Sequence, residues 1–557
     1  MMLVILLASI LAMVALKLSF SSLSSFILKQ AEKHIPRTLW FINPRAYARR
    51  AAKYLAFSLV MFASTVFLTF TVRAPLYVLL VAGAIPSLIL TTSVAAPKLA
   101  STSRRTSVEA ELPMFSVMAS LMAVSGLSLV RAFEAIINSK VFPSLSREAL
   151  LIKRNSLYFN RSPIEALEEV ARDHPSERFR SWILGYSSIL RSGGDVASYL
   201  ASKAKDFLRQ LERRWMNYAN VTNLLGEAVL ALFLLAPMAL SIMALVFASE
   251  LSIWLNTLYN LAVIPLTVLL AALFIHIYQP KTFDRYELGN WPFLSFMLGA
   301  VLFFASMHVL RLELHLSLLY SSMAVVAPLA LISHRQLKVC SSVERALPDF
   351  LRDVTEYRKL GFDVKEALVK LSSRRYNNYF DLLLAKIRQA LDYGVPLSEV
   401  IESLKTPSWM VKAVLASINQ IIESGGGSPA VLEDLTNYVN DYYTAKVMGK
   451  SSVRFQAYIG YGAPLFMAAS AMMMRSLGGQ AVYALSTATS SLTTPLLQGL
   501  QLFSQVLSSI MVTVVLISIA IGVIVAKVAD LTFLSFRHAL ICLASAAIAI
   551  NLLPLLL

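Results

Sequence analysis

Residues 506–527 read VLSSIMVTVVLISIAIGVIVAK, a stretch in which the final Lys527 is the only charged residue. A helix of about 20 apolar residues can cross the hydrocarbon layer of a membrane, because it satisfies its own backbone hydrogen bonds there. Similar stretches recur along the 557-residue chain, which is 57% hydrophobic and only 15% charged, with a mean hydropathy of +0.64. The sequence therefore predicts an all-α, polytopic membrane protein.

Nine or ten stretches are long and apolar enough to span a bilayer. The expected spans are residues 3–20, 55–72, 75–92, 225–247, 252–278, 293–310, 314–333, 456–475, 506–527 and 539–557. The first of them lacks the basic start and the small-residue cleavage site of a signal peptide, so we interpret it as an anchor. The predicted location is the cell membrane.

The basic loop 21–54 sets the orientation of the spans. It carries seven Lys and Arg residues against the single acid Glu32, and cationic loops remain on the cytoplasmic side. Two long polar insertions, with net charges of +6 and +3, then face the cytoplasm as well. The predicted organisation is three spans over 1–97, a first helical bundle over 98–224, four spans over 225–333, a second bundle over 334–455 and three spans over 456–557.

The two insertions repeat each other. Glu111-Leu-Pro-Met-Phe115 aligns with Ala346-Leu-Pro-Asp-Phe350 at an offset of 235 residues, and Ser192-Gly-Gly194 aligns with Ser424-Gly-Gly426 at an offset of 232. Ordered agreement of this kind over some 80 residues indicates a duplicated unit. The shared signature comprises Pro113, Phe115, Gly126, Gly193 and Gly194 in the first copy and Pro348, Phe350, Gly361, Gly425 and Gly426 in the second.

Each insertion is predicted to fold into about six short helices. Leu112, Phe115 and Met122 recur at the spacing of one helix face, which marks an apolar stripe. Gly126 is expected to end that helix, because glycine readily adopts positive φ. The sequence Ser162-Pro-Ile-Glu165 is a capping box that starts another helix.

Paired bundles of this kind, with Leu-Pro-x-Phe at the start and Ser-Gly-Gly before the last long helix, resemble the type II secretion system F family. The resemblance covers both insertions and the spans that follow them, where Ala236-Pro237 and Ala463-Pro464 stand in matching places. The number of spans is more like that of the enlarged archaeal platform proteins. The resemblance implies a platform for assembly of a pilus-like filament, with a cytoplasmic hexameric ATPase and pilin-like subunits as partners.

No stretch of the chain has the pattern of a catalytic, cofactor or metal site. Gly449-Lys450-Ser451 resembles the end of a phosphate-binding loop, but Thr444 stands where that loop needs glycine. His308 and His315 flank a predicted outer turn without the spacing that places two ligands on one helix face. We therefore expect no enzyme activity, no cofactor and no metal.

Exposed cations on the two bundles are the candidates for contact with a partner. An acidic protein surface, the anionic membrane leaflet and ordinary solvated helix faces each account for such a pattern. Nucleic acid is disfavoured, because stacking aromatics are not interleaved with the cations. The candidates are Arg352, Arg358, Lys359, Lys370, Arg374 and Arg375 in the second bundle and Arg104, Arg105, Lys153, Arg154, Arg178 and Arg180 in the first.

Three further questions stay open at the level of the sequence. The uncharged segment 476–505 reads equally well as a re-entrant stretch or as a plain loop. The main functional alternative is a secondary transporter with regulatory domains, and a membrane enzyme with an unrecognised site is a second. The sequence is compatible with a homodimer. It also leaves open whether the filament is an archaellum, an adhesive pilus or a secretion pseudopilus.

Overall fold

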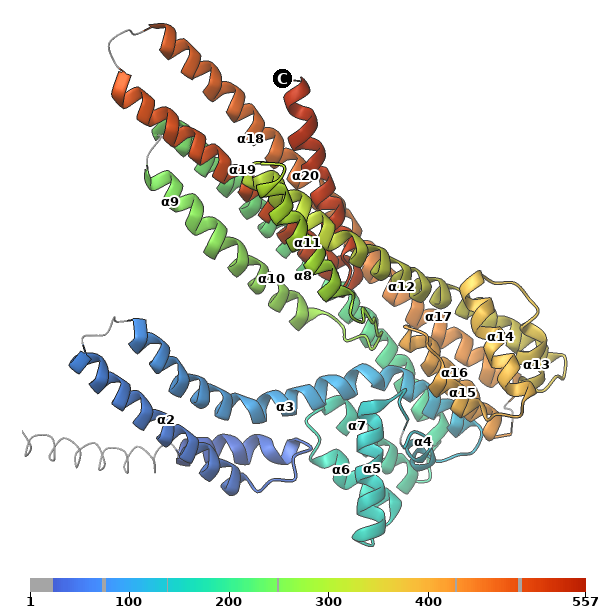
Figure 1. Cartoon of the computed structure of the whole chain (residues 1–557). Coiled ribbons are helices and arrows are strands. Elements are labelled where there is room, and N and C mark those ends of the chain that lie inside the picture. Colours follow the sequence, from blue (N-terminus) through green and yellow to red (C-terminus); the bar gives the residue numbers. More distant parts are fainter. Residues whose placement is uncertain are drawn as a thin grey trace, which may run out of the picture. The chain divides into compact units, whose positions relative to one another are not determined.

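The computed structural model describes residues 24–72, 77–137, 139–247, 250–425, 428–488 and 493–556. Every regular element in these ranges is a helix (Figure 1), which confirms the predicted fold class. The chain divides into two compact units, Met1–Ala204 and Lys205–Leu557. The predicted anchor at residues 3–20 and the repeat residue Gly426 lie outside the described residues.

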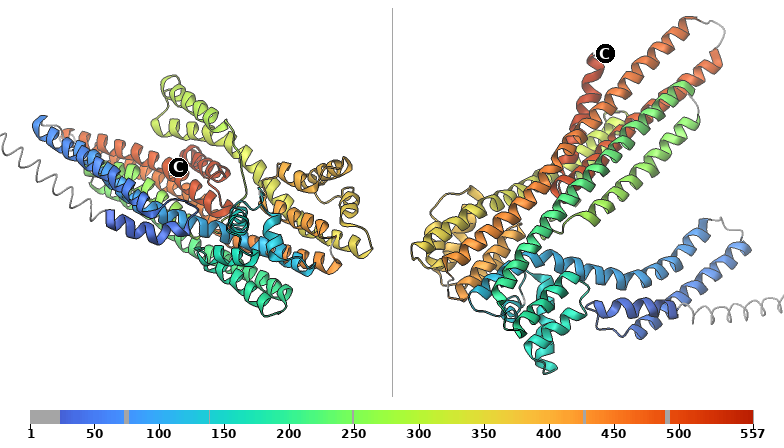
Figure 2. Two further views of the ribbon diagram at one scale, coloured as in Figure 1. Left: turned by 90° about the horizontal axis from the view of Figure 1, so that it is seen from below. Right: turned by 180° about the vertical axis from the view of Figure 1, so that it is seen from behind.

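The first unit contains a helical hairpin. The short 3-10 helix η1 (Ile35–Arg37) precedes α2 (Pro44–Val72), and α2 lies beside the first part of α3 (Tyr77–Val124) in Figures 1 and 2. The hydroxyl of Tyr47 in α2 donates a hydrogen bond to the backbone oxygen of Ser93 in α3 at 2.9 Å. This hairpin contains the second and third predicted spans.

Bundle one consists of the second part of α3 and five further helices. These are α4 (Leu129–Ala135), α5 (Pro143–Tyr158), α6 (Pro163–Arg172), α7 (Glu177–Arg191) and the start of α8 (Val196–Phe247). Phe115 is fully buried in its core, with its ring centroid 4.9 Å from that of Phe133 and 6.0 Å from that of Trp182. Buried aromatic rings contribute large apolar areas, so this cluster contributes to the stability of the bundle.

Bundle two repeats this arrangement in the second unit. Its helices are α12 (Leu314–Lys359), α13 (Val364–Leu371), α14 (Asn378–Asp392), α15 (Leu397–Ser403), α16 (Trp409–Glu423) and α17 (Pro429–Ser452). Phe350 is fully buried, and its ring centroid lies 5.1 Å from that of Phe380. Phe115 and Phe350, equivalent in the repeat, therefore occupy the core of their respective bundles.

Several helix boundaries lie where the sequence predicts them. Ser162 and Glu165 form the reciprocal hydrogen bonds of the capping box at the start of α6. Gly126 and Gly361 have φ of +82° and +92° at the ends of α3 and α12. The side chain of Asp195 accepts a hydrogen bond from the amide of Ser198 at 3.0 Å at the start of α8.

The Leu-Pro-x-Phe motif, which stands at the start of each bundle in the sequence, lies inside a long helix in both copies. Pro113 lies inside α3 and Pro348 lies inside α12. An internal proline removes one backbone hydrogen bond and bends a helix without always ending it. The prediction of short helices is wrong for α3, α8 and α12, which have 48, 52 and 46 residues. Each of these helices contains part of a bundle and part or all of a predicted span.

The second unit also holds the larger membrane region. Its other helices are α9 (Glu250–Leu258), the π-helix η2 (Tyr259–Val263), α10 (Ile264–Tyr278), α11 (Trp291–His308), α18 (Arg454–Ala488), α19 (Thr493–Asp530) and α20 (Arg537–Leu556). Pro265 lies in the first turn of α10. In a regular α-helix a proline ring would clash with the carbonyl four residues earlier, and the wider π turn of η2 lies just before this proline.

Six helices within the described ranges are long and apolar enough to cross a membrane. Each of the following helical stretches includes an apolar window of sufficient length: Ala84–Val124, Val196–Leu240, Ile253–Tyr278, Trp291–His308, Leu314–Lys359 and Ser508–Asp530. The predicted spans 55–72 and 456–475 are also helical, in α2 and α18, as are the described residues 539–556 of the last predicted span, in α20. The protein is therefore a multi-pass membrane protein, and the total of nine or ten spans stays a prediction.

The uncharged segment 476–505 is not a loop. Its backbone is helical over residues 476–488 in α18 and 493–505 in α19. Both α18 and α19, of 35 and 38 residues, exceed the roughly 20 residues that a span needs. The lack of charge in the described residues of this segment therefore reflects the surroundings of two long helices.

Candidate functional site

The six candidate cations of bundle two differ in what they contact. Lys359 pairs with Glu356 at 3.1 Å, Lys370 pairs with Glu366 at 3.3 Å, and Arg374 pairs with Asp353 at 2.6 Å. Arg358 donates to the backbone oxygen of Phe362. Arg352 and Arg375 are exposed and form no ion pair with any described residue. These two side chains are thus the cations of the set that are freest to meet a partner.

The candidate cations of bundle one are also unequal. Arg104 has only 7% of its side chain exposed and contacts Glu148 at 2.6 Å, so it faces the interior of the bundle. Arg105 and Arg178 lie at the rim of a buried carboxylate, Glu109, at 3.0 and 3.7 Å. Lys153 is exposed, Arg154 lies over the ring of Phe41, and Arg180 pairs with Glu177 at 3.4 Å.

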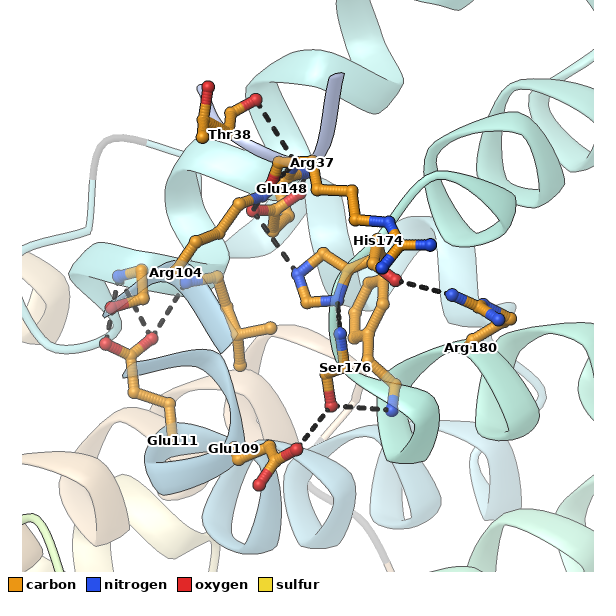
Figure 3. Close-up of polar contacts among 12 residues, drawn as sticks. Arg37, Thr38, Arg104, Glu109, Glu111, Glu148, His174, Ser176 and Arg180 are labelled. Atoms are coloured by element: carbon orange, nitrogen blue, oxygen red, sulfur yellow. Dashed lines mark hydrogen bonds and ion pairs between the residues drawn. The ribbon is translucent and has the colours of Figure 1, made fainter. Parts of the chain in front are cut away.

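Arg104 belongs to a buried polar cluster that attaches the segment before α2 to bundle one. Figure 3 shows its guanidinium group directed toward Glu148, with His174 on the other side of that carboxylate. The same guanidinium donates to the backbone oxygen of Arg37 at 3.2 Å. One side chain of α3 therefore joins α5 of the bundle to the segment that follows η1.

The charge of Glu148 is stabilised by these contacts. Burial alone would raise the pKa of this carboxyl group, but the hydrogen bonds from Arg104 and the nearby His174, whose Nε2 lies 3.7 Å away, hold its pKa below the usual range. Because Glu148 and His174 are both fully buried, loss of Arg104 would leave a carboxylate without its main counter-charge.

A second buried polar contact recurs in both bundles. The hydroxyl of Ser176, at the start of α7, donates to Glu109 at 2.9 Å, and that of Ser408, at the start of α16, donates to Glu344 at 2.8 Å. Each serine also caps its own helix by accepting a backbone hydrogen bond. Glu109 and Glu344 stand at the same offset of 235 as the rest of the first repeat segment, so the repeat extends to this polar contact.

In bundle two the repeated carboxylate is part of a larger buried cluster. The ammonium group of Lys446 lies 2.7 Å from Glu344 and 3.0 Å from Asp284, and all three side chains are at most 6% exposed. Although burial alone lowers the pKa of Lys446, the two carboxylates raise it well above its ordinary value. Burial raises the pKa of Asp284, but Lys446 and the amide of Trp409 outweigh that effect and hold it below its usual range.

Asp284 brings the segment between α10 and α11 onto bundle two. Its carboxylate accepts a hydrogen bond from the backbone amide of Trp409 at 3.0 Å. The amide of Arg285 donates to the backbone oxygen of Pro407 at 3.1 Å, and the ring of Phe283 lies 5.2 Å from that of Trp409. These contacts fix a connection of the membrane region to the start of α16.

The same cluster contains the spacing that a metal site would require. Oxygen atoms of Asp284 and Glu344 and the sulfur atom of Cys340 lie within 4.8 Å of one another. The ammonium group of Lys446 already lies between the two carboxylates and donates a hydrogen bond to each of them. The donor set with its own cation fits a structural ion-pair cluster better than a metal centre.

Gly449-Lys450-Ser451 is part of a regular helix and does not form a phosphate-binding turn. It lies within α17. A Cβ atom at Gly449 would come within 2.7 Å of Trp215 in α8, so glycine permits close contact of these two helices. The packing of α8 against α17 explains this glycine without a nucleotide.

A third polar cluster joins the ends of α19 and α20. Asp530 contacts Arg537 at 2.7 Å and His538 at 2.8 Å. The side chain of Gln279, just after α10, donates to the backbone oxygen of Leu531 in the same connection at 2.7 Å. The connections after α10 and α19 are thereby joined to each other.

Comparison with protein families gives the relationship of the two bundles to known proteins. The family model of the type II secretion system (T2SS), protein F, matches residues 114–244 and again residues 350–474. Both matched segments belong to the type II secretion system F family. Each match covers one bundle and the helix that leads from it into the membrane region, as the sequence resemblance predicted. No curated protein and no solved structure matched the chain.

Membership of the F family gives the general role of the chain. Proteins of this family are membrane platform proteins of secretion and pilus systems. The helical bundles, the candidate spans and the duplicated match all fit that role. Arg352 and Arg375 remain candidates for the contact with a partner, whereas the contacts of Arg104 assign it to the packing of bundle one.

Proposed function

We propose that this protein is the membrane platform on which a pilus-like filament of the archaeal type is assembled. Its two bundles face the cytoplasm and dock on a hexameric secretion ATPase, and pilin-like subunits enter the filament beside its spans. It has no catalytic activity of its own. The energy for assembly comes from the ATPase, and the protein relays the movement.

The observation that supports this relay is the continuity of the long helices. In α12, the apolar first part is a candidate span and Phe350 near its other end is fully buried in the core of bundle two. A helix is a stiff element, so displacement of the bundle moves the span with it. The contact of Asp284 with Lys446 adds a second connection, through the segment between α10 and α11.

The cations that we propose for the ATPase contact are those of the predicted set other than the buried Arg104. Arg352 and Arg375 are the main candidates, because neither forms an ion pair with a described residue. The remaining candidates are Arg358, Lys359, Lys370 and Arg374 in bundle two and Arg105, Lys153, Arg154, Arg178 and Arg180 in bundle one.

Charge reversal at the two main candidates tests the proposed contact. The double variant Arg352→Glu, Arg375→Glu should reduce co-purification of the ATPase and the number of filaments at least tenfold, with an unchanged amount of protein in the membrane. The matched control is Lys386→Glu in α14, another exposed cation without an ion pair among the described residues. Equal filament numbers in the double variant and the control would rule out this contact.

The proposed orientation and the transporter alternative need separate measurements. Single cysteines introduced at Asp363 and at Asn160 should resist a membrane-impermeant maleimide in intact cells and react after lysis. Both positions are exposed at bundle turns. A secondary transporter would instead move solute in vesicles that contain only the purified chain, and such movement would contradict a platform without transport activity.

A further inference from the structure

Bundle one carries an exposed aromatic surface that the platform role does not require. We call it the aromatic tip, and it consists of Trp40, Phe41 and Ile42 before α2 and Leu157, Tyr158 and Phe159 at the end of α5. Phe41, Tyr158 and Phe159 are 76%, 82% and 62% exposed. Large apolar side chains gathered on a surface indicate an interaction site.

The two halves of the aromatic tip are joined by Arg154. Its guanidinium carbon lies 4.9 Å from the ring centroid of Phe41 and 5.9 Å from that of Phe159. A cavity of about 340 Å³ opens beside it, lined by Trp40, Phe41 and Arg154 among others. Aromatic rings and arginine are the side chains that most often dominate protein–protein binding energy.

Bundle two differs from bundle one at this point. Arg154 corresponds to Arg388 at an offset of 234, and Tyr158 corresponds to Asp392. Arg388 pairs with Asp392 at 3.5 Å along α14, as an ordinary surface ion pair. The arginine at this position thus lies on a solvated helix face in bundle two and beside exposed aromatic rings in bundle one.

The cations of α5 favour an acidic partner, although the acids Glu169 and Asp173 also line the cavity beside Arg154. Arg147, Lys153 and Arg161 are exposed and form no ion pair with any described residue. The acid of α5, Glu148, is buried and neutralised by Arg104. The surface of α5 therefore presents unbalanced positive charge next to apolar rings, which favours a partner with complementary acidic groups.

Two other occupants fit the surface less well. Self-association through a two-fold axis would place the same cations of two copies against each other. Insertion into lipid conflicts with distance, because the expected span of α2 begins near residue 55, about 16 Å along the helix from its start at Pro44. A second protein is the occupant that satisfies both the rings and the charges.

We propose that the aromatic tip docks an amphipathic segment of a second protein, whose apolar stripe is flanked by Asp and Glu. Rings of the tip and the cavity beside Arg154 take the apolar side chains, and the cations of α5 take the acids. This inference rests on the proposed function only in placing bundle one in the cytoplasm. It applies whether the docked protein is the ATPase or another component.

Site-specific photo-crosslinking in the native host tests the proposal on the full chain. Benzoylphenylalanine at position 159 should crosslink to a peptide of another protein that combines acidic and apolar residues. The matched control is position 393, since Tyr393 is the repeat equivalent of Phe159 and is likewise exposed. Crosslinks from position 159 only to lipid or to a second copy, or a yield equal to that at 393, would overturn the proposal.

A variant that gives bundle one the surface of bundle two supplies the second measurement. Tyr158→Asp should lower the crosslinking yield of benzoylphenylalanine at position 41 about tenfold. It should preserve the fold, because the new carboxylate can pair with Arg154 as Asp392 pairs with Arg388. The reciprocal control Asp392→Tyr should leave the yield at position 41 unchanged, and an unchanged yield in Tyr158→Asp would contradict the assignment.

The two proposals can fail separately. A crosslinked partner other than the ATPase supports the aromatic tip as a docking site, while the charge reversal at Arg352 and Arg375 decides the ATPase contact. Conversely, loss of ATPase binding in that double variant supports the platform function even if the aromatic tip yields no crosslink, which overturns only the tip.

Discussion

At the scale of single residues, a buried carboxyl group makes the stability of bundle one depend on pH. Glu111 lies in the part of α3 that belongs to the bundle, and its carboxyl group accepts hydrogen bonds from the amides of Ser144 and Leu145 at the start of α5. Burial raises its pKa to about 7, although those amides and Arg147 oppose the shift. Because the pKa of the folded state lies above that of the unfolded chain, the protonated group favours folding.

The pH dependence that follows from Glu111 has a definite sign. Its stabilising contribution is complete below about pH 4.5 and is lost as pH rises through about 7, a change of about 3 kcal/mol. Hydrogen exchange of the amides in the first turn of α5 should therefore become faster between pH 5 and 8, after each measured rate is divided by the intrinsic exchange rate of an unstructured chain at the same pH. Glu111→Gln keeps an acceptor but cannot titrate, so it should remove most of this slope, and an equal slope in both proteins would exclude Glu111 as its source.

Lys446 provides the second prediction at this scale. Lys446→Met should lower the free energy of unfolding of the second unit by about 3–5 kcal/mol, because Asp284 and Glu344 would stay buried without their counter-charge. Thermal unfolding in detergent micelles measures the change. Lys365→Met, at an exposed position of α13, is the control and should change stability by no more than about 0.5 kcal/mol. Similar losses in both variants would show that the charge of Lys446 is not important.

Local signals in the sequence located residues whose roles depend on near neighbours. The cap at Ser162 and the glycines at 126 and 361 follow from side-chain and backbone chemistry within a few residues. The partners of Lys446 could not be predicted in this way, because Asp284 and Glu344 lie 162 and 102 residues away. One available signal is the alignment of Glu109 with Glu344 at the offset of 235 residues, which the prediction did not use.

At the scale of helices, hydropathy and turn signals predict that a helix is present more reliably than they predict how long it is. The six helices of each bundle were expected, but α3 and α12 continue without a break from the membrane region. A change from apolar to polar sequence marks a change of surroundings, and the helical backbone needs no break there. For the same reason the uncharged segment 476–505 left a re-entrant stretch and a plain loop open as alternatives, although its described residues are helical in α18 and α19.

The contact between α8 and α17 gives a prediction for elements. Gly449→Ala should destabilise the second unit by about 1–3 kcal/mol, because the added Cβ atom would lie 2.7 Å from Trp215 and force the helices apart. The thermal midpoint in detergent measures this effect. Gly462→Ala is a suitable control, since its Cβ atom would meet only Phe466 at an ordinary 3.7 Å. A midpoint as high in Gly449→Ala as in the control would contradict close packing at this point.

At the scale of the whole molecule, platform function requires that the movement of a bundle reach the membrane helices. Helix α12 provides one continuous path in the second unit, and Asp284 with Lys446 provides another between the segment after α10 and bundle two. In the first unit, Arg104 attaches the segment after η1 to bundle one. Buried charges suit such connections, because their partial separation is energetically costly and they move as a unit.

Making α12 more flexible should therefore reduce filament assembly without reducing binding of the ATPase. The triple variant His334→Gly, Arg335→Gly, Lys338→Gly changes exposed positions between the span and the bundle core, and each glycine in a helix interior costs about 1 kcal/mol relative to alanine. We expect ATPase co-purification to persist while filament number falls at least fivefold. Replacing the same three residues by alanine removes the same charges but keeps the helix stiff, so that control should assemble filaments normally. If the glycine and alanine variants assemble filaments equally well, the stiffness of α12 does not transmit the movement. If both variants lose filaments, the loss is caused by removal of the charges at these positions and not by a more flexible helix.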